Sequence, residues 1–532
     1  MIRGNALTFH VREAVSATVC SAIPRGVGIM DNNMTGGYAI RGILIALSLL
    51  GTLELIGATG VASYTISSNP SAIMVAFASG PESRGFSWQT DESISESEVR
   101  LVEGAASPHD YETTPLVFTG SCVRVGKPAA HSHKVVVKGL KRGIAYSYRL
   151  GGAGHYAYGR TDVKSPNDFV TIVNFNDVQL SDPGKLHMWD NTLAASVREV
   201  GGSAAVDFIV NGGDFIDGRM RMPAKGIKAL VGCLSNPMGC SVEWGIAAEP
   251  VAMFYPGVPW VSSSGDHDSL EYGNRIAVEY PTGLPLGCES LDYGNVHVVA
   301  LPFVASVWSR RHEEIMDWLE ADLAANAATG KSDWRIVCVH WGPNTTGDHG
   351  MRAPGTTNLV VRLGGICASN KVDLVLQAHD HTFSKTLPYR WGGTGWTVKD
   401  NDSEVVNLVP KKNKEDSGIW DVDPNGTYYL SCGCAGHRVG ENAKYASQKG
   451  KKSYRNRRYK IATGTLAVDS KWGCRGDPAS MDIPRSMFGV MHIDGNRLKY
   501  DFFVVNKDGS HGLVDSLCIL KTRSLGSPKD KP

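Results

Sequence analysis

Residues 372–381 read Val-Asp-Leu-Val-Leu-Gln-Ala-His-Asp-His. The first five are short, mostly apolar and partly β-branched, which predicts a buried strand. His379 and His381 come after it one residue apart, so their side chains point to the same side if the extended geometry persists. Because neutral imidazole is the commonest metal ligand in proteins, the pair is a candidate half of a metal site. The alternative is a pair of surface or hydrogen-bonded histidines.

Four earlier stretches show the same arrangement, because an Asp or a His follows the end of each apolar strand pattern within a few residues. Ligands of open α/β sheets bind beyond the carboxyl ends of the strands, so these side chains are expected to converge. A turn or a helix cap explains each motif alone, whereas five motifs at one offset indicate a common site. The strand patterns are 169–173, 206–210, 258–262 and 334–339, and the motifs after them are Asp177-x-Gln179, Gly213-Asp214-x-x-Asp217, Gly265-Asp266-His267-Asp268 and His340.

The 532 residues are too many for one hydrophobic core, so two or more domains are expected. Residues 67–165 read as short strands between turns, which predicts an all-β sandwich. Residues 168–522 alternate strands with helical patterns, such as 311–328, which predicts an α/β domain with a basic insertion around 440–480. A charged content of 20% and a net charge of +1 give no global reason to expect nucleic acid or a membrane surface as a partner.

Residues 1–66 read as a leader. Arg41 precedes a short apolar run that tails off into small residues, which is the pattern of a secretory signal peptide. Signal peptides begin near the first residue, so Met34 is a candidate true start, and residues 1–33 would then be absent from the product. The alternative is an uncleaved membrane anchor at 42–62, which the shortness of the apolar run disfavours. We therefore expect a secreted, periplasmic or cell-surface protein.

The number of cysteines is consistent with an exported protein. Ten of the 11 come after the leader, and an even number outside the cytosol permits disulfides. Cys233 and Cys240 are the best local pair, and Cys432 and Cys434 also lie close in sequence. Cys338 lies inside an apolar strand pattern, which predicts a buried thiol.

Taken in order, the five motifs resemble the signature of calcineurin-like metallophosphoesterases. The stretches 380–384 and 293–297 are similar to the purple-acid-phosphatase-like branch of that family. The resemblance covers roughly residues 70–520. It implies an N-terminal β-sandwich followed by a four-layer α/β-β-α metallophosphoesterase domain.

The N-terminal strands carry a resemblance of their own. The Trp88-Gln-Thr strand and the Leu140 turn before Tyr146-x-Tyr148 resemble the fibronectin-type-III-like domain that precedes the catalytic domain in purple acid phosphatases. Any other β-sandwich explains the periodicity equally well. This part carries no obvious chemistry, so its expected role is to pack on the next domain or to shape its cleft.

The resemblance implies a pair of metal ions. Two cations about 3.5–4 Å apart lower the pKa of a bound water molecule and clamp a phosphoryl group, which supplies both the nucleophile and the charge relief that phosphate ester hydrolysis needs. Mixed carboxylate and imidazole ligands suit divalent or trivalent iron, manganese or zinc and do not decide among them. By resemblance, Asp214 bridges the ions, Asp177, Gln179 and His381 hold one of them, and Asp266, His340 and His379 hold the other.

The resemblance also implies the remaining catalytic groups. His267 would stay off the metals, contact the substrate and protonate the leaving oxygen, with Asp268 orienting its ring. His349, in the loop after His340, would touch the phosphate, and an exposed loop histidine is the alternative. The implied activity is acid-phosphatase-like hydrolysis of phosphate monoesters by a metal-bound hydroxide. The alternatives are a phosphodiesterase or nucleotidase with the same centre, or a non-catalytic binding protein that retains the fold.

Four residues depart from the family pattern. Gln179 stands where many members have His, and its neutral carbonyl oxygen is a weaker donor. Asp266 replaces the usual Asn, and its negative charge strengthens cation binding while it weakens attraction to an anionic substrate. Ala378 replaces Gly at little cost unless its φ is positive. Asp217 stands where purple acid phosphatases have Tyr, so no tyrosinate-to-iron colour is expected.

Residues Lys449 to Lys460 form a basic run within the insertion. It holds seven Lys or Arg side chains interleaved with tyrosines, so both a solvated loop and a polyanion-binding rim that steers phosphorylated substrates are open. The expected partner is a phosphorylated small molecule or another phosphoester. We expect neither a specific nucleic acid nor a stable protein partner.

Overall fold

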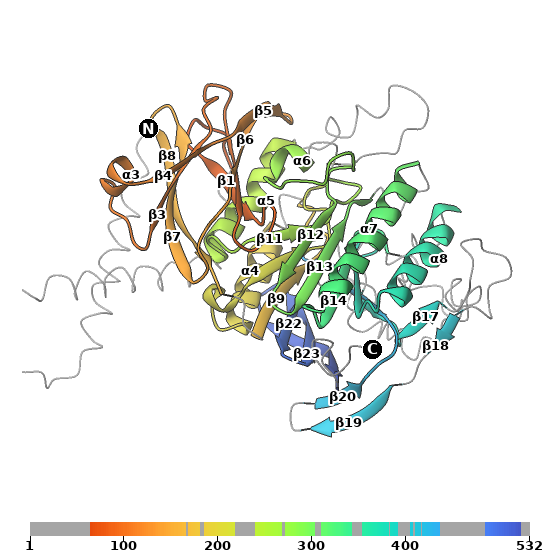
Figure 1. The fold of residues 1–532 in the computed structure, drawn as a ribbon. Coiled ribbons are helices and arrows are strands. Elements are labelled where there is room, and N and C mark those ends of the chain that lie inside the picture. Colours follow the sequence, from red (N-terminus) through yellow and green to blue (C-terminus); the bar gives the residue numbers. More distant parts are fainter. Residues whose placement is uncertain are drawn as a thin grey trace, which may run out of the picture. The chain divides into compact units, whose positions relative to one another are not determined.

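The computed structural model describes most of the chain between residues 64 and 522 (Figure 1). The predicted leader at 1–66 lies outside the described residues, apart from its last three positions. None of the described helices has the length and apolar character that a membrane span requires. The described ranges are 64–165, 169–180, 186–218, 240–268, 272–303, 310–342, 354–381, 383–391, 405–407, 410–415, 418–436 and 485–522.

Residues 71–163 form eight strands and one short helix, because short apolar runs alternate there with turn residues. Four of the strands make an antiparallel sheet in the order β4-β3-β7-β8, and the other four lie at one end of a twelve-stranded sheet in the order β1-β2-β6-β5. Trp88, Leu101 and Tyr148 belong to a buried cluster that both groups of strands share. The likeness to a fibronectin type III domain stays a prediction. The bounds are β1 (Ser71–Ala76), β2 (Arg84–Thr90), β3 (Glu98–Glu103), α3 (Asp110–Thr113), β4 (Leu116–Thr119), β5 (Ser121–Val125), β6 (Ala130–Val137), β7 (Ile144–Gly152) and β8 (His155–Val163).

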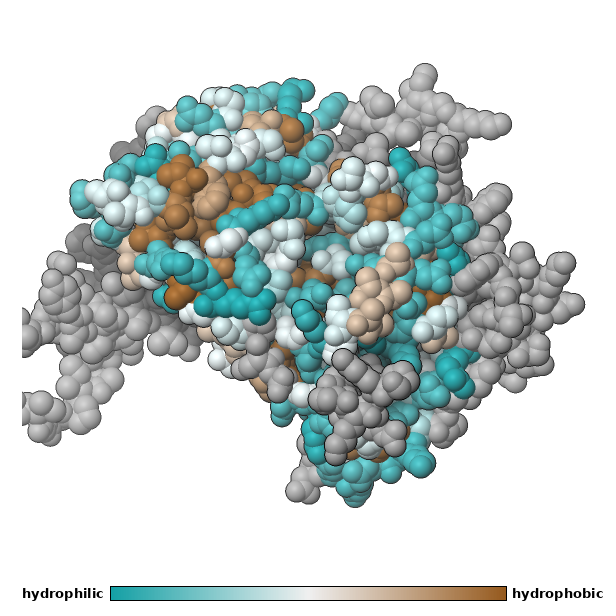
Figure 2. All heavy atoms as spheres, viewed as in Figure 1, coloured by the Kyte–Doolittle hydropathy of each residue, from teal (hydrophilic) through white to brown (hydrophobic). Residues whose placement is uncertain are grey.

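The surface of these strands carries exposed apolar side chains. On the face drawn in Figure 2, hydrophobic residues gather over this part of the chain and are interspersed with hydrophilic ones. Leu116 and Val117 of β4 are 49% and 50% exposed. Globular proteins commonly expose apolar side chains, so this exposure by itself assigns no function to the surface.

The remaining strands of the twelve-stranded sheet come from residues 169–520. Strands β9, β10 and β11 run parallel to one another, and β22, β23 and β24 pair with them as an antiparallel meander. β11 pairs with β1 through Trp260 and Ala76, which joins the two parts of the sheet. The bounds are β9 (Phe169–Phe175), β10 (Phe208–Asn211), β11 (Trp260–Ser262), β19 (Lys411–Glu415), β20 (Gly418–Val422), β22 (Arg485–Asp494), β23 (Arg497–Asn506) and β24 (His511–Leu520).

A second sheet has the strand order β12-β13-β14-β15-β21-β16. Strands β13, β14, β15 and β21 are parallel, and all their residues are buried, because both faces of the sheet are covered. A two-stranded ribbon, β17 with β18, comes next after β16 in the sequence. The bounds are β12 (Glu289–Tyr293), β13 (Val296–Leu301), β14 (Trp334–Val339), β15 (Leu374–Gln377), β16 (Phe383–Lys385), β17 (Tyr389–Trp391), β18 (Val405–Asn407) and β21 (Tyr428–Cys432).

The two sheets pack face to face, with helices on their outer faces. Alternate residues of β9 show this directly, since Ile172 belongs to the cluster between the sheets and Val173 to the cluster under the helices. Helices α4 and α5 cover the first sheet, and α7 and α8 cover the second. This confirms the predicted α/β class. The bounds are α4 (His187–Glu199), η2 (Ser203–Ala205), α5 (Cys240–Phe254), α6 (Tyr272–Arg275), α7 (Arg310–Thr329) and α8 (Pro354–Ser369).

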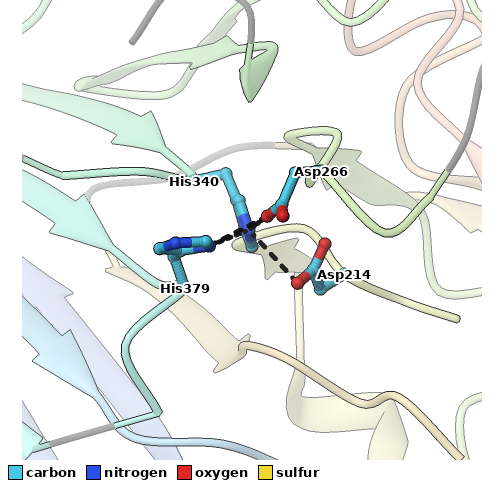
Figure 3. Close-up of side chains that lie close together, drawn as sticks. All are labelled: Asp214, Asp266, His340 and His379. Carbon is cyan, nitrogen blue, oxygen red and sulfur yellow. Dashed lines mark hydrogen bonds and ion pairs between the residues drawn. The ribbon is translucent and has the colours of Figure 1, made fainter. Parts of the chain in front are cut away.

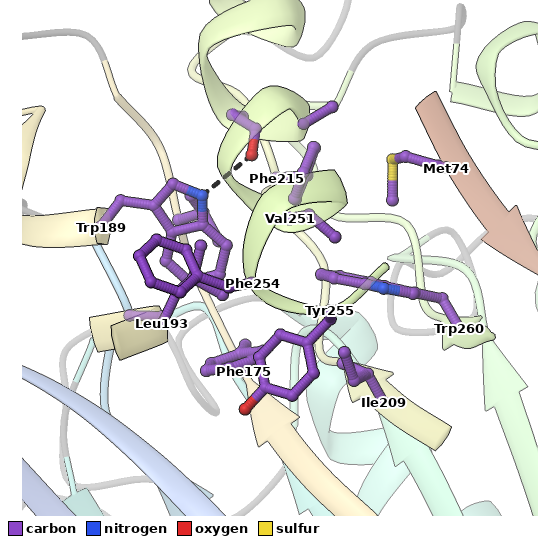
Figure 4. Packing of buried hydrophobic residues seen from close by; sticks show 14 of the residues in the cluster. Met74, Phe175, Trp189, Leu193, Ile209, Phe215, Val251, Phe254, Tyr255 and Trp260 are labelled. Atoms are coloured by element: carbon purple, nitrogen blue, oxygen red, sulfur yellow. Dashed lines mark hydrogen bonds between the residues drawn. The ribbon is translucent and has the colours of Figure 1, made fainter. Parts of the chain in front are cut away.

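Aromatic packing under α4 and α5 anchors the loops after β9 and β10 (Figure 4). Phe175 meets Trp189 of α4 edge-on, with ring centroids 5.1 Å apart. Phe215 meets Trp260 edge-on at 5.7 Å. Aromatic pairs of this geometry add about 0.5–1.5 kcal/mol to their burial. The chain that leaves β9 and the chain that leaves β10 are therefore fixed to one core.

The cysteines agree with the prediction in part. Cys240 forms a disulfide bond, and its predicted partner Cys233 lies outside the described residues. Cys338 is a buried thiol, as predicted, and burial raises its pKa to about 12. Cys432 and Cys434 are also buried thiols, so these two neighbours do not form a disulfide with each other.

Candidate metal centre

Five of the predicted site residues lie within four residues of the carboxyl ends of five strands. Asp177, Asp214 and Asp266 come after β9, β10 and β11 of the first sheet. His340 and His379 come after β14 and β15 of the second sheet. The strands of each group run parallel, so within each sheet these ends lie at one edge. Side chains from the two sheets meet at this edge, where His340 contacts both Asp214 and Asp266.

The backbone is strained at this edge. Nine non-glycine residues of the described chain have a positive φ, and five of them are at these strand ends. Such conformations cost about 1–3 kcal/mol each and persist only where the surrounding structure holds them. Five such residues at one edge of the sheets indicate that the backbone there is held in conformations that direct particular side chains toward a common site. The five are Asp177 (+51°), Gln179 (+34°), Asp214 (+54°), His379 (+70°) and His381 (+51°).

Two glycines allow the loops after β10 and β11 to approach each other. A Cβ atom on Gly265 would collide with the carboxylate of Asp214, and a Cβ atom on Gly213 would lie 2.7 Å from Nδ1 of His340. Gly213 also has a φ of +98°, which side chains rarely adopt. Glycine at both positions therefore brings Asp214 next to His340 and the β11 loop.

Four side chains form the first group of candidate ligands, which we call the His340 cluster: Asp214, Asp266, His340 and His379 (Figure 3). Nε2 of His340 lies 3.1 Å from Oδ1 of Asp266 and 3.3 Å from Oδ2 of Asp214. Nδ1 of His379 lies 2.8 Å from the same oxygen of Asp266. Each side chain offers one ligand atom within 4.8 Å of the others, so four donors surround one point.

The second group, the His381 cluster, consists of Asp177, Asp214 and His381. Nε2 of His381 lies 3.7 Å from Oδ1 of Asp177. The carboxylate of Asp177 also accepts the backbone N–H of His379, at 3.0 and 3.1 Å, which ties the β9 loop to the β15 loop. Asp214 belongs to both clusters, so its carboxylate is the group that they share.

The donor set of the clusters fits metal ions. Nδ1 of His340 donates to the carbonyl oxygen of Gly212 at 2.8 Å, so Nε2 of the neutral ring carries a lone pair that faces carboxylate oxygens. This arrangement is repulsive unless a proton or a metal ion lies between them. Within the described part of the chain, the ion pairs of Asp177, Asp214 and Asp266 are all with histidines. A metal ion in each cluster would supply the missing positive charge.

The pKa shifts of Asp177 and His340 also indicate that the clusters favour a bound cation. Burial raises the pKa of Asp177 well above its ordinary value, and the carboxylates of Asp214 and Asp266 add to that shift. Burial alone would lower the pKa of His340, but Asp214 and its neighbours outweigh burial and raise the pKa well above the ordinary value. Both shifts favour the protonated form, which is the form that a neighbouring cation would replace.

Gln179 lies at the centre, as predicted, but it contacts the site as a donor. Its side-chain NH2 group donates to Oδ2 of Asp214 at 2.6 Å. In this orientation the amide positions the shared carboxylate, and its role as a metal ligand stays a prediction.

The partner of the His267 ring differs from the predicted one. Nδ1 of His267 is 2.6 Å from Oδ1 of Asp217, whereas Asp268 faces the other way. Nε2 of His267 is 3.8 Å from Oδ2 of Asp266, so this nitrogen faces the His340 cluster. Burial lowers the pKa of His267, but Asp214, Asp217 and Asp266 outweigh burial and raise it to about 9.

Asp268 instead holds the loops together. Its carboxylate accepts the backbone N–H groups of Asp214 (2.9 Å), Phe215 (2.7 Å), Ile216 (3.2 Å) and Gly265 (2.6 Å). These four hydrogen bonds direct the carboxylate of Asp268 toward the β10 loop and away from the ring of His267. Burial raises the pKa of Asp268 to about 6, and the carboxylate of Asp214 adds to the shift.

Trp341 is a site residue that the sequence pattern did not reveal. Its indole stacks on the imidazole of His379, with ring centroids 4.7 Å apart and an interplanar angle of 26°. The available signal was its position directly after His340. His349 and the basic run from Lys449 to Lys460 lie outside the described residues.

Comparisons with known proteins show a family and a fold that this chain is similar to. Residues 170–383 match the family model described as calcineurin-like phosphoesterase. A stretch of 92 residues is 32% identical to purple acid phosphatase 7 of Arabidopsis thaliana and covers 15% of this chain. The chain thus spans only 27% of that relative's length. The structure of purple acid phosphatase PPD1 from yellow lupin (Lupinus luteus) seeds matches with a TM-score of 0.54 at 14% identity, over 86% of this chain and 76% of that one, which is a likeness of fold.

Proposed function

We propose that this chain, whose residues 170–383 form a calcineurin-like metallophosphoesterase domain, hydrolyses phosphate esters at a two-metal centre around Asp214. The observation that carries the proposal is the overlap of the two ligand clusters in one carboxylate. The likeness to purple acid phosphatases supports a phosphate monoester as the substrate.

Each cluster would hold one metal ion. When bound, a pair of cations lowers the pKa of a water molecule and offsets the negative charge on the phosphoryl oxygens. Asp214 would contact both ions, and its carboxylate is held in place by Gln179 and by the backbone N–H of His267, which donates to Oδ1 at 2.8 Å. Gly212 fixes the tautomer of His340 that leaves Nε2 available.

His267 has the geometry of the proton donor for the leaving oxygen. Its Nδ1 is occupied by Asp217, and its Nε2 faces the His340 cluster. The side chain is 21% exposed, so a substrate can reach it, while the carboxylate of Asp217 is buried. A proton held on Nε2 can pass to the ester oxygen as the P–O bond breaks.

The test is turnover of p-nitrophenyl phosphate and of bis-p-nitrophenyl phosphate by the metal-loaded protein. We expect faster turnover of the monoester, and loss of activity in a chelator. His267→Ala should lower kcat for the monoester by about 10²- to 10⁴-fold, and His155→Ala, in the distant strand β8, should leave it unchanged. Absence of turnover of both esters would contradict the proposal, and a preference for the diester would contradict its monoester part.

A further inference from the structure

Two aromatic rings contact the imidazole of His379. The indole of Trp341 stacks on it face to face, and the ring of His340 meets it edge-on with centroids 5.2 Å apart. Trp341 is partly exposed and belongs to neither ligand cluster. Its ring therefore contacts a candidate ligand without being one.

The register of the second sheet places the two rings together. Val339 pairs with Gln377 at the ends of the parallel strands β14 and β15, and the backbone N–H of Ala378 donates to the carbonyl oxygen of His340 at 3.0 Å, so the segments that carry Trp341 and His379 leave the sheet side by side. Gly342 permits this approach, because a Cβ atom there would collide with the side chain of Gln377. The stack is thus built into the strand ends.

The orientation of the His379 imidazole depends on neighbours that restrict its rotation. Its backbone is in the left-handed region, with a φ of +70°. In the observed ring orientation Nδ1 points at the cluster, where it lies 2.8 Å from Oδ1 of Asp266 and 3.3 Å from Nε2 of His340. A flat indole against the ring opposes rotation about the Cβ–Cγ bond. It also favours the positive ring that metal coordination creates.

We propose that Trp341 is a positioning residue, which holds His379 in the orientation that binds the metal ion of the His340 cluster. This inference rests on the proposed two-metal centre. Loss of the indole frees the ring of His379 to rotate, so the affinity of the His340 cluster falls while the His381 cluster keeps its ion. Partners that orient a ligand typically change metal affinity by about 10- to 100-fold.

The experiment is a calorimetric titration of the chelator-treated full chain with Zn²⁺. Wild type should bind two ions per chain, and Trp341→Ala should bind one of them about tenfold more weakly. Trp341→Phe keeps a ring face and should retain an affinity close to that of wild type. Trp341→Leu removes the ring but keeps much of the volume, so it replaces the Ala variant if that variant unfolds. Trp318→Ala, which removes a similarly half-buried indole from α7, is the matched control and should bind as wild type does.

Combining Trp341→Ala with the loss of one candidate histidine ligand shows which of the two ions is bound more weakly. In His379→Ala protein, Trp341→Ala should have no further effect, whereas in His381→Ala protein it should weaken the one remaining ion. The role of Trp341 would be overturned if wild type, Trp341→Ala and Trp341→Leu bound both ions with equal affinity. It would also be overturned if Trp318→Ala lost as much affinity for Zn²⁺ as Trp341→Ala. A wild-type protein that binds no Zn²⁺ would instead overturn the two-metal centre itself, before any variant is compared.

Discussion

Oδ1 of Asp217 lies 2.6 Å from Nδ1 of His267, and the Asp217 side chain is only 1% exposed. The backbone N–H of Asp217 in turn donates to the buried carboxylate of Glu243 at 2.6 Å. A buried carboxylate on Nδ1 fixes the ring orientation and leaves Nε2 as the group that meets the substrate. The relationship therefore makes Asp217, which is far from His267 in sequence, the residue that orients the ring of the proposed proton donor.

Replacement of Asp217 by Asn should lower kcat most for esters with a poor leaving group. An alkyl phosphate depends on proton donation, so we expect a loss of about 10²-fold, with a smaller loss for p-nitrophenyl phosphate. Metal content should stay at the wild-type value, because Asp217 belongs to neither cluster. Equal losses on both esters together with loss of metal would show that Asp217 is a ligand instead.

Replacement of Asp268 by Asn should mainly lower stability. The carboxylate accepts four backbone N–H groups, two on each oxygen, and the amide of Asn replaces one of those oxygens by a donor. We expect the free energy of unfolding to fall by about 3 kcal/mol, since hydrogen bonds to charged groups contribute about 1.5–3 kcal/mol each. Chemical denaturation measures the change. Asp508→Asn, in an exposed turn, is the control. If both substitutions lowered the free energy of unfolding equally, Asp268 would not be the residue that holds the two loops together.

Glu289 should make stability fall with rising pH. Burial raises its pKa from 4.5 to about 8, and among the described residues its carboxylate accepts one hydrogen bond, from the backbone N–H of Ser262 at 3.2 Å. Between these values the folded protein holds a proton that the unfolded chain has lost, so the free energy of unfolding decreases as the pH rises. Glu289→Gln removes this titration. From about pH 5 to about pH 8 the variant should gain up to about 4 kcal/mol over wild type, at about 1.4 kcal/mol per pH unit. Thermal unfolding curves whose difference does not change with pH would contradict this assignment.

Iron-loaded protein should lack a visible tyrosinate-to-iron band. The position that carries Tyr in purple acid phosphatases is Asp217 here, and its carboxylate contacts His267. Absorption spectra of protein loaded with Fe³⁺ and Zn²⁺ provide the measurement. A purple sample would show that another tyrosine reaches the metals.

The five strands that precede the site motifs could be predicted because each is a short and mostly apolar run. The pattern at 334–339 coincides with β14, and the helix expected at 311–328 is α7 within one residue at each end. Helix α5 (Cys240–Phe254) gave no such signal. Its buried residues lie on all sides of the helix and it contains Pro250, so it has no helical periodicity for a sequence pattern to reveal.

The convergence of the candidate ligands could be predicted because each of them lies within a few residues of the end of a recognisable strand. The partner of His267 could not, because it depends on how two loops approach each other. Gly213 and Gly265 permit that approach, and the backbone N–H groups of one loop are held by Asp268 of the other. The contact of Trp341 with His379 likewise depends on strand register, which the sequence alone does not specify.

The metal content of the purified full chain, with Asp214→Asn beside it, tests the central claim most directly. Elemental analysis should find two ions per chain in wild type. His381→Ala should retain one ion, because the His340 cluster remains, and Asp214→Asn should lose affinity for both ions, because one carboxylate serves both clusters. Wild-type protein with no metal, or Asp214→Asn protein that holds two ions as tightly as wild type, would contradict the account.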